Sequence, residues 1–135
     1  MEYLIGLVLA LGVLGGATVV GFDRERVFYP AVTITVAGYY VLFAAMAASG
    51  PVLAAEIIAA GVFVLLAAIG FRTSLWLVAV ALAGHGAFDF VHHLFIDNPG
   101  VPDWWPGFCM TFDVVAGAYL AVLLKMRPGL AVRGQ

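Results

Sequence analysis

Residues 84–98 read GHGAFDFVHHLFIDN, and this stretch places three histidines and two aspartates within an otherwise apolar part of the chain. On a helix, residues four apart differ by about 40° and residues seven apart by about 20°. His85, Asp89 and His92 therefore share one stripe, whereas His93 is turned about 80° away from His85. Because an ionisable residue inside a membrane span costs at least about 2.5–3.5 kcal/mol, this stripe is the first candidate for a functional site.

The composition around this stretch is typical of an integral membrane protein. The chain has 135 residues, of which 64% are hydrophobic and 10% charged, and its mean hydropathy is +1.09. A soluble domain has about 25% charged residues. The formal net charge of −2 indicates no partner, and the lack of a basic run excludes nucleic acid. The single cysteine excludes an intrachain disulfide.

Outward from residues 84–98, five segments are apolar and long enough to cross a bilayer as helices, for which about 20 residues suffice. They predict one all-α domain, a bundle of five transmembrane helices without a β-sheet, with spans at about 3–22, 28–48, 52–71, 75–95 and 107–124. We expect the first segment to be a permanent span, because no lysine or arginine precedes it and no signal-peptidase site follows it. Its Gly12 and Gly16 form a G-x-x-x-G motif, which favours packing between helices and a homo-oligomer.

The basic residues predict the orientation. With five spans, all six fall on one side of the bilayer: Arg24, Arg26, Arg72, Lys125, Arg127 and Arg133. The positive-inside rule then places the N-terminus outside and the C-terminus in the cytoplasm. In this orientation five ionisable groups from three predicted helices fall in the outer half of the membrane: Glu56, His85, Asp89, His92 and Asp113.

Histidine and carboxylate side chains are the ligands of zinc, iron and manganese. We expect His85, Asp89 and His92 to bind a divalent metal, zinc or iron, with Asp113 or Glu56 as a further ligand or as the general base. Without a metal, the same residues can act as a proton relay or as a general acid and base. In a purely structural alternative, His85 pairs with Asp113 and His92 with Glu56 only to hold helices together.

Two further residues are candidates with simpler explanations. Cys109 precedes Asp113 by four residues and shares its helix face, where a small buried apolar filler is favoured over a thiolate ligand. His93 points away from the stripe, and an interfacial position or a hydrogen bond to the turn at 97–98 explains it as well as ligation does.

Three classes of function are compatible with these residues. The leading hypothesis is a metal-dependent membrane enzyme that acts on a lipid-like or isoprenoid molecule, because a site between apolar helices opens sideways into lipid. A proton-coupled or metal-ion transporter is the alternative, although the inner halves of the spans offer few polar side chains for a path. The third class is a structural subunit.

The segment HGAFDFVHHL, followed by Asn98-Pro99, Pro102, Pro106, Cys109 and Asp113, resembles an uncharacterised bacterial family of small multi-span membrane proteins, a domain of unknown function. The likeness covers most of residues 24–121, and Ala87-Phe88 and Trp104-Trp105 depart from the family pattern. It implies a multi-pass protein of the bacterial inner membrane. It also implies one functional set, namely Glu56, His85, Asp89, His92, His93, Cys109 and Asp113, but no reaction.

Overall fold

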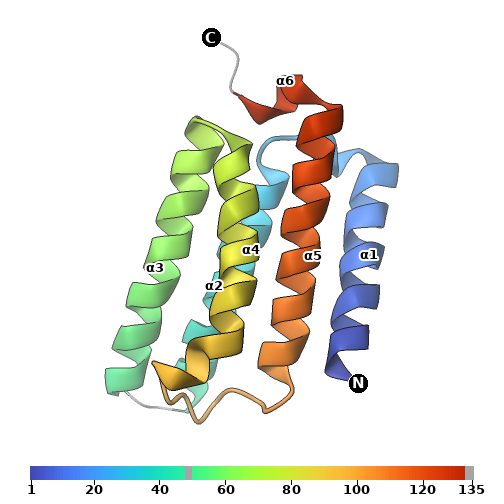
Figure 1. Ribbon diagram of the computed structural model, residues 1–135. Helices are drawn as coiled ribbons and strands as arrows, with labels where there is room; N and C mark the ends of the chain where they lie inside the picture. The colour runs from blue at the N-terminus through green and yellow to red at the C-terminus, as the bar shows by residue number, and fades with distance from the viewer. Residues whose placement is uncertain (48–49, 133–135) are drawn as a thin grey trace.

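The computed structural model describes residues 1–47 and 50–132, and five long helices run side by side through them (Figure 1). The long helices are α1 (Glu2–Val20), α2 (Phe28–Met46), α3 (Gly50–Arg72), α4 (Leu75–Val91) and α5 (Trp105–Met126). Three short helical segments join or follow them: η1 (Phe22–Arg24), η2 (His92–Leu94) and α6 (Pro128–Ala131). Four of the long helices, and α4 together with η2 (Leu75–Leu94), are long and apolar enough to cross a membrane. The predicted all-α class with five spans is confirmed, and the chain is consistent with a multi-pass membrane protein.

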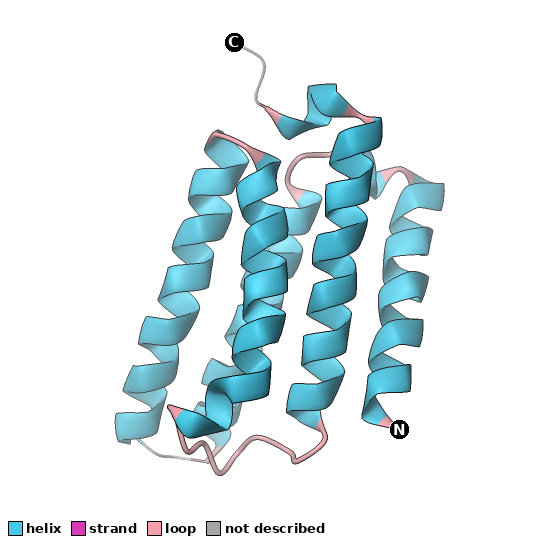
Figure 2. Cartoon of the chain, viewed as in Figure 1, coloured by secondary structure: helices cyan, strands magenta, loops and turns pink. Residues whose placement is uncertain are grey.

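Loops are the only other structure of any length in the described part of the chain (Figure 2). A single isolated β-bridge joins Ser74 and Val132.

Local sequence explains where several helices begin and end. Ser74 caps α4 by accepting a hydrogen bond from the backbone N–H of Trp76. Pro106 lies in the first turn of α5, where its missing N–H is tolerated, and Gly21 ends α1 with a positive φ of 93°.

The boundaries correct the expected spans at several points. The α-helical part of the fourth span ends at Val91, and residues 92–94 form the 3-10 turn η2 instead of continuing the helix to residue 95. The third helix begins at Gly50, two residues before the expected start. Pro51 then lies in the first turn, where proline is tolerated. The fifth helix extends over 105–126, two residues beyond the expected span at each end. The expected end of the second span at Ala48 lies outside the described residues.

Helix α5 packs along α1 on one side and along α4 on the other, while α2 packs against α3 (Figure 1). Two glycines permit the closest approach of α4 and α5. A Cβ atom at Gly86 would lie 2.8 Å from the carbonyl oxygen of Met110, and one at Gly117 would lie 2.9 Å from that of Ala79. Small residues at helix contacts are typical of membrane bundles.

The glycine-rich face of α1 packs differently. A Cβ atom at Gly12, Gly15 or Gly16 would meet nothing within 4 Å. These glycines therefore do not serve contacts between α1 and the rest of the described chain. The homo-oligomer that the G-x-x-x-G motif favours stays a prediction.

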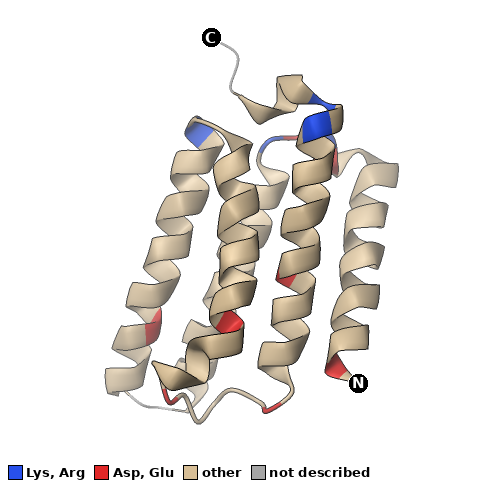
Figure 3. Ribbon diagram, in the orientation of Figure 1, with Lys and Arg blue, Asp and Glu red and all other residues tan. Residues whose placement is uncertain are grey.

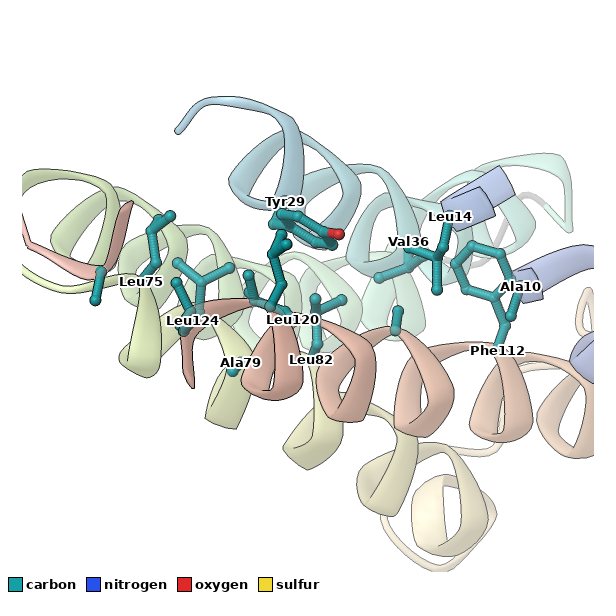
Figure 4. Packing of buried hydrophobic residues seen from close by; sticks show 14 of the residues in the cluster. Ala10, Leu14, Tyr29, Val36, Leu75, Ala79, Leu82, Phe112, Leu120 and Leu124 are labelled. Carbon is teal, nitrogen blue, oxygen red and sulfur yellow. The ribbon is translucent and has the colours of Figure 1, made fainter. Parts of the chain in front are cut away.

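An apolar core fills much of the bundle between α1, α2, α4 and α5. Figure 4 shows Leu14, Tyr29, Leu82, Leu120 and Leu124 directed toward one another from these helices. These leucine side chains, like Leu75 and Ala116, are buried. Cys109 of this core adjoins the candidate site, which is formed by α4 and α5.

Basic residues gather at one end of the bundle, whereas acidic residues lie at both ends and inside it (Figure 3). The described basic residues lie at the end where α1, α3 and α5 finish: Arg24, Arg26, Arg72, Lys125 and Arg127. Arg133 lies outside the described residues. Acidic residues mark the opposite end, near the start of α1 and in the loop between η2 and α5. The position of the basic residues is the pattern on which the predicted orientation depends.

Asp23 lies at the basic end of the bundle, in the short 3-10 segment that connects α1 and α2. Its side chain is buried and accepts a hydrogen bond of 3.0 Å from Thr18 Oγ1. Arg127 Nη1 lies 3.6 Å from the same carboxylate, and Thr18 Oγ1 lies 2.6 Å from the hydroxyl of Tyr119. Arg26 is also tied down, because it donates to the backbone carbonyls of Phe71 and Leu130.

Candidate metal centre

Four side chains from α4 and α5 form a compact buried group. His85 Nδ1 lies 2.6 Å from Asp113 Oδ2 and 3.5 Å from Asp89 Oδ2. The thiol of Cys109 donates to Asp113 Oδ2 at 3.6 Å. All four side chains are at most 2% exposed. Spacing by four residues on each helix produces this arrangement, because 85 and 89 share one face of α4 and 109 and 113 share one face of α5.

This group can hold a metal ion, since one ligand atom from each residue lies within 4.8 Å of the others. A tetrahedral zinc ion with bonds of about 2.0–2.3 Å separates its ligand atoms by about 3.3–3.8 Å. Shifts of about 1 Å therefore bring the four ligand atoms to that spacing. Cys109, for which the sequence favoured the role of apolar filler, belongs to this group.

Glu56 and His92 form a separate pair. His92 Nε2 lies 2.9 Å from Glu56 Oε1, and both side chains are at most 3% exposed. The same oxygen accepts a hydrogen bond of 2.8 Å from Asn98 Nδ2. His92 shares the predicted stripe with His85, but seven residues along a helix span about 10 Å. That axial distance separates His92 from His85, and the ligand atoms of the compact group include none from His92.

Asn98 fastens the loop that follows η2 to the bundle. Besides Glu56, its amide Nδ2 donates to the backbone carbonyl of Tyr40 at 3.1 Å. Its Oδ1 accepts from the backbone N–H of Gly100 at 3.1 Å. One side chain thus joins the loop to α2 and α3 and helps to hold the carboxylate of Glu56 in place.

Tyr40 lies between the pair and the four-residue group. Its ring centroid is 4.1 Å from that of His92 and 6.3 Å from that of His85. Its hydroxyl is buried and interacts with the carboxylates of both Asp89 and Glu56. Phe63 closes another side of His85 with an edge-on contact at 4.6 Å.

His93 does not join either group, because its side chain is exposed. It lines a polar pocket of about 410 Å³ at the acidic end of the bundle, and His92 and Asn98 line the same pocket. The pocket also includes Glu2, Asp97 and Asp103. Water and cations at this end of the protein can therefore approach the His92–Glu56 pair through a mouth that carries acidic side chains.

Sequence reasoning placed most of these residues but did not assign roles to Asn98 or Tyr40. Asn98 sits in an Asn-Pro turn, a context in which asparagine is ordinary. Tyr40 lies mid-span, where a phenol needs a polar neighbour. The signal for Tyr40 was present, but periodicity alone does not show which of Tyr39 and Tyr40 faces the polar groups.

Comparison of the chain with protein-family models, with curated proteins and with solved structures finds no match.

Proposed function

We propose that this chain is a metal-dependent membrane enzyme that acts on a lipid-like substrate, with His85, Asp89, Cys109 and Asp113 as the metal-binding group. One observation carries the proposal. No hydrogen bond of ordinary geometry reaches either carboxylate oxygen of Asp89 or Oδ1 of Asp113 in the described part of the chain, although His85 Nδ1 lies 3.5 Å from Asp89 Oδ2 and the Tyr40 hydroxyl interacts with Asp89. Buried carboxylates need compensation, and a cation within reach of all four ligands supplies it.

Charge balance supports a divalent cation. Two ionised aspartates carry two negative charges, which one divalent ion neutralises within the apolar bundle. Coordination by Cys109 releases its thiol proton and adds a third negative charge to the group. The ligand set of nitrogen, sulfur and carboxylate oxygen suits zinc or iron better than magnesium or calcium, which prefer oxygen alone. A bound metal of this kind supplies Lewis-acid chemistry and lowers the pKa of a coordinated water.

The His92–Glu56 pair is proposed to serve proton transfer. It lies beside the polar pocket, through which water reaches it, and Tyr40 lies between it and the metal-binding group. Glu56 is proposed as the general base in place of Asp113, because Asp113 belongs to the metal-binding group whereas Glu56 lies outside it and pairs with His92.

The transporter alternative requires a polar route from this site to the basic end of the bundle. Polar side chains gather again at Asp23 and Tyr119, but the apolar core, which includes Leu82 and Leu120, lies between the two polar regions. A site with one polar mouth agrees better with an enzyme than with a channel. The proposed orientation puts the basic end in the cytoplasm and the site in the outer half of a bacterial inner membrane.

Elemental analysis of protein purified in detergent without chelator tests the proposal. We expect about one zinc or iron per chain in the wild type, and its loss in His85→Ala and Asp89→Asn. His93→Ala is the matched control, because it removes an exposed histidine near the site and is expected to keep the metal. Far-UV circular dichroism verifies that the variants are folded. A folded wild type without metal, or equal metal content in all four proteins, would refute the metal site.

A further inference from the structure

An apolar groove of about 660 Å³ runs between α1, α2 and α5. Its side chains are almost wholly apolar, and those on its rim are substantially exposed, with Ile5 at 53%, Leu9 at 47% and Tyr39 at 37%. Within a membrane these exposed side chains face lipid, so the groove opens sideways to the bilayer.

The groove reaches the metal-binding group through one residue. Cys109 lines the groove, and its thiol contacts Asp113 on the other side. The polar pocket, by contrast, reaches the His92–Glu56 pair. Two openings of opposite character thus lead to the two neighbouring buried groups: the apolar, lateral groove reaches the metal-binding group, and the polar, terminal pocket reaches the His92–Glu56 pair.

The groove has the size of one hydrocarbon chain. A water molecule takes about 30 Å³ in the liquid, so 660 Å³ holds about 20 groups of that size, which is similar to a methylene group. This volume suits a single chain of about twenty carbons and falls within the range of about 300–1,000 Å³ for small-molecule sites.

The polarity along the groove indicates which end of a bound hydrocarbon chain lies at which end of the groove. Trp104 and Trp105 line the groove where α5 begins, as expected for residues at a membrane interface. Cys109 lies one turn deeper, and Phe28 lines the groove at the opposite, basic end. The indole Nε1 of Trp105 is buried without a hydrogen-bond partner in the described residues and can donate to an oxygen.

We infer that the groove binds the tail of a single-chain lipid with an oxygen-bearing head group, the substrate of the proposed enzyme. The head group lies near Trp105 and Cys109, beside the metal-binding group, and the tail extends toward Phe28 along α1 and α2. This inference depends on the proposed function for the role of the ligand as a substrate. The binding site itself depends only on the groove.

Photolabelling tests the inference. Protein reconstituted in phospholipid vesicles is irradiated with a long-chain primary alcohol that carries a diazirine in its chain, and the adducts are mapped by mass spectrometry. Ala31→Phe fills the groove, because Ala31 lines it on an exposed face of α2. Ala68→Phe is the matched control, an equal change on an exposed face of α3 that lines none of the described pockets.

We expect adducts to concentrate on groove residues of α1, α2 and α5, to fall about tenfold in Ala31→Phe and to persist in Ala68→Phe. Adducts spread evenly over the exposed faces of all five helices in the wild type would overturn the inference, whether or not Ala31→Phe folds. Metal content is measured on the same samples. Groove labelling in a metal-free protein would contradict the proposed enzyme and leave the groove as a lipid site, whereas bound metal without groove labelling would contradict only the groove.

Discussion

Replacing Gly86 with alanine is expected to force α4 and α5 apart at the site. The added Cβ would lie 2.8 Å from the carbonyl oxygen of Met110, 3.0 Å from Val114 Cγ2 and 3.2 Å from Asp113 Cβ. Ordinary contacts begin at 3.4 Å, so the helices must separate by about 0.6 Å at this point (3.4 minus 2.8). His85 immediately precedes Gly86, and therefore its 2.6 Å contact with Asp113 is expected to lengthen too.

The size of the effect follows from two opposing terms. Alanine is favoured over glycine inside a helix by about 0.8–1.0 kcal/mol, and overpacking a tight contact costs about 1–3 kcal/mol. Gly84→Ala is the matched control, since a Cβ at Gly84 would meet nothing within 4 Å. We expect Gly84→Ala to raise the free energy of unfolding by up to about 1 kcal/mol and Gly86→Ala to fall about 1–3 kcal/mol below it.

Unfolding of both variants in mixed micelles, followed by far-UV circular dichroism against the mole fraction of denaturing detergent, measures this difference. Metal content under limiting metal is the second readout, and we expect it to drop in Gly86→Ala alone. If Gly86→Ala proves as stable as Gly84→Ala and binds metal equally well, the close packing of α4 on α5 at the site is wrong.

Glu56→Ala leaves two buried groups, those of His92 and Asn98, without their acceptor, and is expected to lower the free energy of unfolding by about 2–5 kcal/mol. Glu56→Gln keeps an acceptor oxygen and is expected to cost less than half of that; equal losses would contradict the pairing. Asp23→Ala is expected to cost about 0.5–1.5 kcal/mol, because Thr18 and Arg127 lose their contacts with the carboxylate while Thr18 keeps Tyr119 as a partner, and an unchanged unfolding midpoint would count against the Asp23 contacts. Chelation is expected to lower the thermal midpoint and added zinc or iron to restore it, since the ion binds the folded state; a midpoint indifferent to both would argue against a resident metal. A reporter fused to the C-terminus is expected to be active if it requires the cytoplasm and inactive if it requires the periplasm. The reverse result would contradict the predicted orientation.

The sequence predicts the five spans well because bilayer thickness imposes a length and a polarity on each of them. The histidine–carboxylate pairs His85–Asp113 and His92–Glu56 are those of the structural alternative drawn from the sequence, whereas its leading hypothesis places His85, Asp89 and His92 on one metal ion. Helical spacing does not show that the five ionisable residues divide into two groups. That division depends on axial distance along α4 and on the position of α3.

Contacts made by ordinary loop and turn residues escape sequence reasoning. Asn98 has three partners that lie in or near α2, α3 and its own loop, and no local pattern names them. Asp23 looks like part of a charged turn, yet it is buried by Thr18 and Arg127, which approach from other segments. Such contacts arise from tertiary packing, and the hydrophobic periodicity of a single sequence does not predict them.

The contact within α4 between His85 and Asp89 has a consequence for how the chain is made. Synthesis and insertion proceed from the N-terminus, so α4 enters the bilayer 28 residues before Asp113 is available to His85. His85 Nδ1 and Asp89 Oδ2 lie 3.5 Å apart on the same helix, as i,i+4 neighbours. The two side chains can therefore partner each other as soon as that helix forms, which lowers the cost of carrying both into lipid. When α5 inserts, His85 gains a shorter contact with Asp113 on the neighbouring helix, at 2.6 Å.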